Sequence, residues 1–161
     1  LGVVSLILMI LANKKNRELL NINVKELVLI NEMSMTIGLV MLTIGNFLGG
    51  MWANESWGRY WGWDPKETWA LISIMVYAFV IHMRLIPGLK SNFAFTVASI
   101  LSFGSIIMTY FGVNFYLAGL HSYAKDDQEI SLVFISITLV IILILSLLAY
   151  PKYKKYLKNN R

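Results

Sequence analysis

The chain has 161 residues, of which 57% are hydrophobic and 14% are charged. A soluble domain carries roughly 45 to 50% apolar and about 25% charged residues, so this composition is typical of a membrane protein. The sequence has no cysteine, which excludes disulfides, thiolate metal sites and thiol nucleophiles within it. Its net charge of +5 does not indicate nucleic-acid binding, because the basic residues flank apolar runs instead of forming a polar face with interleaved aromatic rings.

Apolar stretches follow one another along the chain. The first, residues 1–12, is too short to span a bilayer and lacks the basic region of a signal peptide, so we interpret it as a truncated span at the start of a C-terminal fragment. Residues 13–31 mix apolar and charged side chains and are expected to lie along the membrane surface. Four further stretches reach the length of about 20 apolar residues that a spanning helix needs, namely residues 33–51, 68–86, 92–112 and 130–150.

These stretches predict an all-α fold, a polytopic transmembrane helical bundle with four full spans and one truncated N-terminal span. Residues 1–161 form a single membrane domain in this prediction, since no repeat or linker divides them. Lysine and arginine are frequent in 13–31 and in the tail from residue 152, and sparse in 52–67 and 113–129. Short cytoplasmic loops are enriched in these residues, so we predict a cytoplasmic C-terminus, with loop 52–68 and segment 113–129 outside.

All five tryptophans lie in the segment WANESWGRYWGWDPKETW, from Trp52 to Trp69. One interpretation is an interfacial belt, because tryptophan settles at the level of the lipid headgroups. The other is an aromatic surface for a planar, largely apolar ligand, which glycine lets the backbone approach closely. The candidate residues for this surface are Trp57, Gly58, Arg59, Tyr60, Trp61, Gly62, Trp63 and Asp64.

Charged residues in the same segment have more than one interpretation. Arg59 and Lys66 can pair with anionic groups of a ligand, although isolated charges of this kind are more often solvated. Asp64 precedes Pro65 and lies three residues before Glu67, the pattern of a capping box with proline at the first helical position. For Asp64 the structural role is the favoured one.

The chain has two histidines, and the first is His82. It follows Trp69 by 13 residues, which places it roughly 20 Å along a helix that crosses a hydrocarbon core of about 30 Å. An ionisable group at that depth indicates function, and the alternative is a neutral imidazole bonded to a neighbouring helix or reaching the interface beside Arg84. Met75 and Ala78 fall near the same stripe of the helix, so a gap at the small residue lies beside the imidazole.

The second histidine, His121, lies in the external segment GVNFYLAGLHSYAKDD. A single loop histidine usually has no special role. In an apolar external segment that faces a tryptophan-rich loop, however, an imidazole is a reasonable axial ligand for a haem iron. Spacing alone does not identify the ligand as haem.

The motif WGRYWGWDPKETWALI resembles the tryptophan-rich WWD signature of the haem-handling proteins of cytochrome c biogenesis. Its DPKETWAL continuation resembles the CcsA (ResC) branch more than the CcmC or CcmF branches. His82 in YAFVIHMR and His121 in GVNFYLAGLHSYA resemble the transmembrane histidine and the second external histidine of that family. The resemblance runs from about residue 38 to residue 124.

The resemblance implies system II cytochrome c biogenesis, in which the protein takes part in a cytochrome c synthase (haem lyase) complex. It implies that haem, as haem b before attachment, is carried outward and presented on the tryptophan loop to apocytochrome c. His82 would then ligate the iron at an inner site and His121 the iron at an outer site. The implied partner is a CcsB (ResB)-like membrane protein or fused domain, in a bacterial cytoplasmic membrane or a thylakoid.

This sequence departs from the family in one respect, because the family's upstream external histidine has no counterpart here. Two alternatives stay open. One is a haem chaperone or exporter of the CcmC type with no role in thioether formation. The other is a membrane scaffold that its tryptophans merely anchor.

Overall fold

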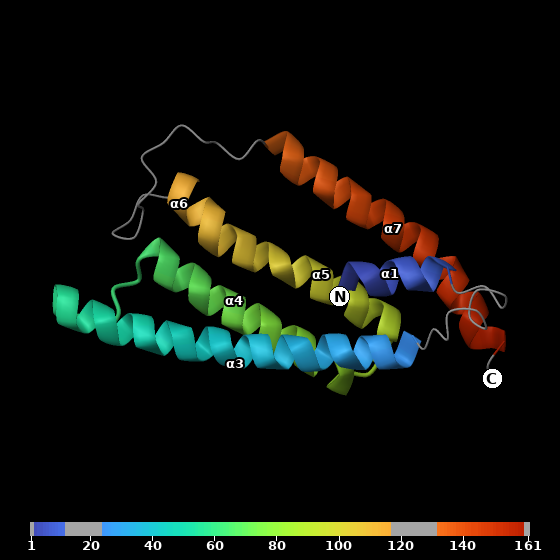
Figure 1. Cartoon of the computed structure of the whole chain (residues 1–161), viewed down its shortest axis with the longest axis horizontal. Coiled ribbons are helices and arrows are strands. Elements are labelled where there is room, and N and C mark those ends of the chain that lie inside the picture. The colour runs from blue at the N-terminus through green and yellow to red at the C-terminus, as the bar shows by residue number, and fades with distance from the viewer. Residues whose placement is uncertain (1, 12–23, 117–131, 160–161) are drawn as a thin grey trace.

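A computed structural model describes residues 2–11, 24–116 and 132–159 of the chain, and the helices within these ranges are seen in Figure 1. No strand occurs in these ranges, which confirms the all-α prediction. The elements are α1 (Gly2–Leu11), α3 (Val24–Trp57), α4 (Pro65–His82), the 3₁₀ turn η1 (Met83–Leu85), α5 (Asn92–Ile107), the π-helical turn η2 (Met108–Gly112), α6 (Val113–Tyr116) and α7 (Leu132–Asn159).

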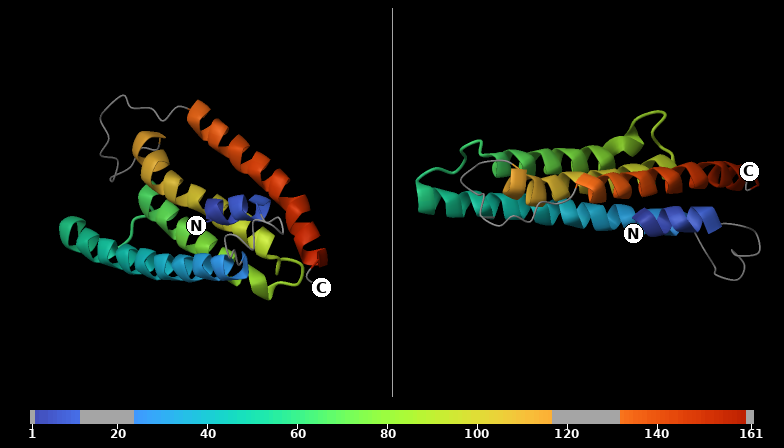
Figure 2. Two further views of the ribbon diagram at one scale, coloured as in Figure 1. Left: turned by 45° about the vertical axis from the view of Figure 1, so that its right-hand side comes forward. Right: turned by 90° about the horizontal axis from the view of Figure 1, so that it is seen from above.

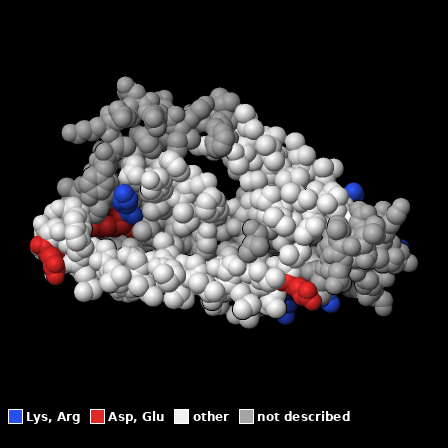
Figure 3. All heavy atoms as spheres, viewed as in Figure 1, with Lys and Arg blue, Asp and Glu red and all other residues white. Residues whose placement is uncertain are grey.

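Four of these helical segments are long and apolar enough to cross a membrane, which confirms the predicted number of full spans. They are Val24–Trp57, Pro65–Leu85, Asn92–Gly112 and Ile135–Lys155. The apolar helix α1 has 10 residues and is too short to cross. On the face shown in Figure 3 the described charged side chains gather at the two ends, and the surface between them is uncharged.

The helix α3 is longer at both ends than the predicted span, and this corrects the sequence interpretation of its first part. Residues 24–31 do not form a separate surface segment but the first turns of α3, where Val24 and Val28 are buried. These side chains find apolar neighbours in the bundle, which the local charge pattern does not reveal. The rest of the predicted surface segment lies outside the described residues, and at its other end α3 continues to Trp57.

The bundle is built on three neighbouring helices, α3, α4 and α5, which contact one another pairwise. α4 runs antiparallel to both α3 and α5 (Figure 1). α1 packs against α7, α5 and α3, whereas α7 contacts α1 and α5. The first turns of α7 lie apart from the other helices in Figure 1 and in the left view of Figure 2.

We call the two ends of the bundle the core end and the tryptophan end. The core end is formed by α1, the starts of α3 and α5, and the ends of α4 and α7. The tryptophan end is formed by the end of α3, residues 58–64, the start of α4, η2 and α6. The main hydrophobic cluster of buried side chains lies at the core end and comprises Leu6, Met9, Val24, Val28, Met35, Val80, Met83, Phe95, Ala149 and Tyr153.

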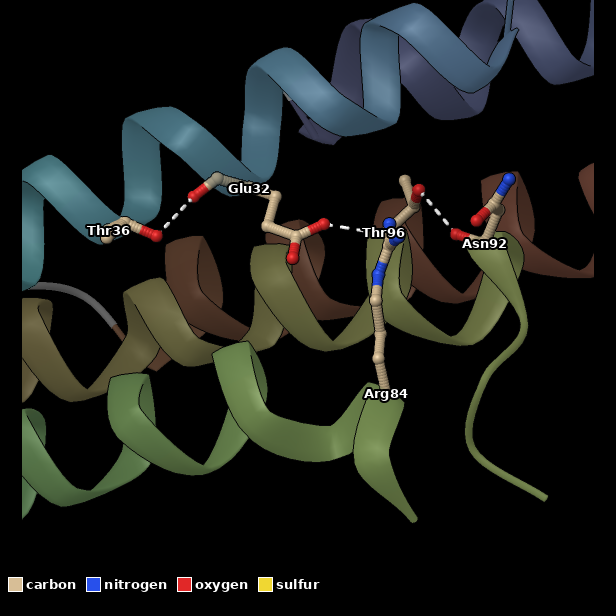
Figure 4. Close-up of polar contacts among 5 residues, drawn as sticks. All are labelled: Glu32, Thr36, Arg84, Asn92 and Thr96. Carbon is tan, nitrogen blue, oxygen red and sulfur yellow. Dashed lines mark hydrogen bonds and ion pairs between the residues drawn. The ribbon is translucent and has the colours of Figure 1, made fainter. Parts of the chain in front are cut away.

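Polar contacts between helices also occur at the core end (Figure 4). Arg84 Nη1 lies 3.2 Å from Glu32 Oε2, which connects η1 to α3. The guanidinium carbon of Arg84 lies 4.7 Å from the centre of the Phe95 ring of α5. Nearby, Asn31 Nδ2 donates a hydrogen bond of 2.8 Å to Ser99 Oγ. Charge and amide contacts therefore join α3, η1 and α5 at one level of the bundle.

Candidate ligand site at the tryptophan end

The tryptophan end begins where α3 stops. Gly58 has a φ of +69°, and its N–H donates to the carbonyl of Asn54 at 2.9 Å. Glycine favours such a left-handed C-cap because it has no Cβ. Directly before this cap, the ring of Trp57 meets the ring of Trp52 edge to face, with centroids 5.1 Å apart and an angle of 78°. Trp57 thus lies on the last turn of α3. The sequence analysis had placed it in the loop 52–68.

Tyr60 folds back against α3 after the cap. Its hydroxyl donates to the carbonyl of Phe47 at 3.2 Å. A Cβ at Gly50 would lie 2.8 Å from Cζ of the Tyr60 ring, so the ring occupies the space that this glycine leaves. Gly50 therefore allows the chain after α3 to lie close against that helix.

Arg59 also turns back toward the protein. Its side chain is half-buried, and a Cβ at Gly62 would collide with its guanidinium group. Lys66, on the first turn of α4, donates from Nζ to Asn114 Oδ1 of α6 at 3.3 Å. Both cations considered as ligand contacts thus lie at this end, and each lies against the protein.

Trp61 and Trp63 form a second edge-to-face pair, with centroids 5.8 Å apart and an interplanar angle of 87°. Trp61 is half-buried, whereas Trp63 is 71% exposed. Trp63 has a φ of +57°, a left-handed conformation that L side chains adopt rarely. Such a conformation persists only where the surrounding structure imposes it, and it is frequent at ligand sites.

The start of α4 confirms the predicted capping box. Asp64 is the N-cap, its side chain accepts from the Lys66 N–H at 3.2 Å, and Pro65 occupies the first turn. Glu67 Oε2 accepts from the Asp64 N–H at 3.2 Å and also from the Gly62 N–H at 2.7 Å. Asp64 is buried, in keeping with its favoured structural role.

A cavity of about 460 Å³ lies between α3 and α4, next to residues 60–61. Small-molecule sites usually occupy about 300 to 1,000 Å³ and are mostly apolar with a few polar groups. On the α3 side its wall includes Gly45, Gly49 and Asn46, and across from them lie Trp61 and Glu67. The cavity therefore has the volume of a small-molecule site, and aromatic rings form part of its wall.

Three polar residues of this cavity were missed by the sequence analysis. Asn46 is the one amide in the stretch 33–51, a signal that was available because polar residues are costly in a membrane. Glu67 was predicted only as a capping residue. Thr109 reaches the cavity from η2, where its hydroxyl donates to the Trp69 carbonyl at 3.1 Å. No sequence pattern indicated this π-helical turn, a feature that often occurs at functional sites.

His82 lies at the opposite end of α4, about 25 Å from the capping box along the helix. Its imidazole is exposed, and Nδ1 lies 2.7 Å from the Ala78 carbonyl of its own helix. A carbonyl only accepts, so Nδ1 is the donor in this hydrogen bond, and Nε2 is the ring nitrogen that does not take part in it. The bond is to the backbone of the same helix and not to a neighbouring helix.

His121, the predicted outer ligand, lies outside the described residues. Within the described part of the chain, no three His, Asp or Glu side chains come together in a group that could hold a bare metal ion. The described site thus offers apolar and aromatic surface at one end and a single imidazole at the other.

Fold and site together define a helical membrane protein with an aromatic-walled cavity at one end. Residues 1–121 match the family model described as "Cytochrome C assembly protein", and the chain belongs to this family. The chain is therefore a membrane-spanning member of this cytochrome c assembly family.

Three relatives with known names are similar to the chain. "Protein NrfI" of Wolinella succinogenes is 54% identical over 131 residues, which are 81% of this chain and 14% of that protein. "Cytochrome c biogenesis protein CcsA" of Cyanophora paradoxa is 51% identical over 88 residues, 55% of this chain and 27% of that protein. The protein of the same name from Cuscuta reflexa is 48% identical over 102 residues, 63% of this chain and 33% of its own length. The chain thus spans at most a third of these relatives.

Proposed function

We propose that this chain binds haem at its tryptophan end and presents it to apocytochrome c for covalent attachment, as part of a system II cytochrome c synthase. The observation that favours this function most is the cavity of about 460 Å³ with Tyr60 and Trp61 in its wall, beside the exposed ring of Trp63. An exposed aromatic ring beside an apolar cavity suits a planar macrocycle. An interfacial belt needs no such cavity.

The described residues fit haem in three respects. The cavity wall is mostly apolar, and each ring of the edge-to-face pair Trp61 and Trp63 has its own flat face. Arg59 and Lys66 are cations at the same end that suit carboxylate groups. Bound haem would supply the vinyl groups to which the thiols of apocytochrome c add. The chain's own residues would hold the macrocycle and keep water away from one of its faces.

The axial ligands belong to this proposal as well. We assign His121 to the iron at the outer site and His82 to the iron at an inner site, which haem reaches first. For His82 the support is an exposed imidazole whose Nδ1 is already bonded, so that Nε2 is the ligating atom. Its exposed face suits a second ligand from a CcsB-like partner. The proposed topology has the tryptophan end outside and the C-terminus in the cytoplasm.

The relatives named CcsA favour this function over a CcmC-type chaperone or exporter without a role in thioether formation. A purified protein of either kind holds haem, so the two differ in whether cytochrome c receives it covalently. Covalent cytochrome c measured in a host lacking its own synthase, with the CcsB-like partner supplied, separates them. Haem retention without covalent cytochrome c would favour the chaperone.

The test of haem binding is the Soret absorbance per purified protein in detergent. Trp61→Ala and Trp63→Ala should each lower it severalfold, and Trp61→Phe should lower it less because a ring remains. The matched control is Phe103→Ala on α5, which removes another exposed aromatic ring outside the cavity lining. Equal haem content in all four variants and the parent would contradict the proposed site and support the anchoring interpretation.

A further inference from the structure

Residues 62–64 are held by one carboxylate oxygen. Glu67 Oε2 accepts from the Gly62 N–H at 2.7 Å and from the Asp64 N–H at 3.2 Å. These two amides lie on either side of Trp63 in the chain. A carboxylate that accepts from two backbone amides makes strong, charge-assisted hydrogen bonds, and here they close a small ring around a single residue.

The residue inside this ring is the one with the unfavourable backbone. Trp63 has a φ of +57°, and its carbonyl accepts from Thr68 Oγ1 at 3.4 Å. Without compensating contacts the backbone of Trp63 would relax to the β or right-handed α region, which an L residue adopts without steric strain. Relaxation would swing the Trp63 ring away from Trp61, because the direction of Cβ depends on φ.

The capping box accounts for only one of the two amide bonds. That motif requires the Glu67 side chain to reach the N-cap residue, Asp64. The bond to Gly62 is the shorter one, and it reaches two residues further back, into the segment that contains Trp61 and Trp63. Stabilising the first turn of α4 does not need this second bond.

We propose that Glu67 is a positioning residue, which holds Trp63 in its left-handed conformation and so sets the orientation of the exposed ring toward the ligand. This inference rests on the proposed function, because it assumes that Trp63 contacts haem. Glu67 itself acts through the backbone of residues 62–64. Its side chain restricts the conformation of this segment before the ligand binds. Less conformational entropy is therefore lost on binding.

The test is a double-mutant cycle on the haem dissociation rate of the full-length protein, measured by transfer to excess apomyoglobin. Glu67→Leu should raise this rate on the order of tenfold in the parent, since it removes both amide bonds. In a Trp63→Ala background the same change should have an effect of less than about twofold, because the ring that Glu67 orients is gone. A full effect of Glu67→Leu in both backgrounds would overturn the inference.

Conservative variants and a charge control complete the cycle. Glu67→Gln keeps a carbonyl oxygen for the amides, so it should restore a rate near that of the parent. Glu67→Asp keeps the charge but is one methylene shorter, so the haem dissociation rate should rise. If the Glu67→Leu protein does not fold, Glu67→Asp takes its place in the cycle. Glu55→Ala removes an exposed acidic side chain at the end of α3, at the same end of the bundle, and should leave the rate unchanged.

The outcomes separate the two proposals. If Trp61→Ala and Trp63→Ala leave haem dissociation unchanged, the proposed function fails. If these variants release haem faster while Glu67→Leu and Glu67→Asp behave as the parent, only the role of Glu67 fails. The role of Glu67 would also be overturned if Glu67→Leu released haem at the parent's rate and Glu67→Gln released it faster. The glutamine side chain would then affect haem release by some route other than the lost hydrogen bonds.

Discussion

The same helices are packed closely at the core end and loosely at the tryptophan end. In its first half α3 buries Val24, Val28 and Met35, whereas in its second half it turns Gly45 and Gly49 toward a cavity. Branched and long side chains fill the space between helices, and glycine leaves it open. The difference indicates that the core end holds the bundle together, and the space at the tryptophan end agrees with the proposed ligand site.

Polar groups are also used differently at the two ends. At the core end the ion pair of Arg84 and Glu32 joins separate helices. At the tryptophan end Glu67 bonds to backbone amides of its own neighbouring segment. The first arrangement determines how helices lie against one another, and the second determines the shape of one turn. Substitutions should therefore affect stability mainly at the core end and ligand binding mainly at the tryptophan end.

The largest expected effect concerns the two sides of the membrane. The chain has no cysteine, so a single introduced cysteine can be labelled without background. The two positions are Glu55, on the last turns of α3, and Lys154, near the end of α7. A membrane-impermeant maleimide added to intact cells should label Glu55→Cys and leave Lys154→Cys unlabelled until the membrane is opened. Labelling of both from the same side would contradict a bundle that spans the membrane between its two ends.

The next effect is expected for Phe95, the fully buried ring at the core end. Phe95→Ala should lower the free energy of unfolding in detergent by about 3 kcal/mol, because it leaves a cavity and removes the ring beneath Arg84. The matched change at the other end, Trp63→Ala, removes a ring that is 71% exposed and should cost less than about 0.5 kcal/mol. Equal losses of stability would remove the distinction between the ends.

A smaller loss is expected when the ion pair is broken. Glu32→Ala leaves Arg84 with one more unpaired nitrogen, since its Nε and Nη2 are already buried without a hydrogen-bond partner among the described residues. The two side chains are 30% and 26% exposed, so solvent screens part of the interaction and we expect a loss of about 1 to 2 kcal/mol.

Thermal unfolding in detergent measures this loss, and the haem content of folded protein should stay unchanged. The control is Thr36→Ala, one turn further along α3, which removes a hydroxyl that donates to the Glu32 carbonyl of its own helix (Figure 4). If the control loses as much stability as Glu32→Ala, the ion pair does not join the helices.

The smallest effect has the opposite sign. Trp63→Gly should raise the free energy of unfolding by up to about 1 kcal/mol, because glycine adopts a positive φ without steric strain and little packing is lost. The same variant should lose haem as Trp63→Ala does. Unfolding curves of the two variants measure the difference, and a glycine variant less stable than the alanine variant would show that residue 63 is not strained.

Much of the local structure could be predicted from the sequence because it depends on neighbours in the chain. In a bilayer the backbone must satisfy its hydrogen bonds within each segment, so four long apolar stretches predict four helices. The capping box at Asp64 and Glu67 was recognised for the same reason, since its parts are three residues apart. For Gly58 the sequence predicted only that it lies in the aromatic surface. The structure shows that it is the C-cap of α3.

Other features depended on residues that are distant in the sequence. The first turns of α3 are buried because α1, α4 and α5 cover them, and charges at Lys25 and Glu26 had suggested a surface segment. The ion pair between Glu32 and Arg84, and the contact of Thr109 with Trp69, join segments that no local pattern relates. The left-handed backbone of Trp63 is equally invisible in the sequence, because tryptophan has no preference for it. Tertiary structure decided these features, since each arises only when separate helices or the ends of a turn are brought together.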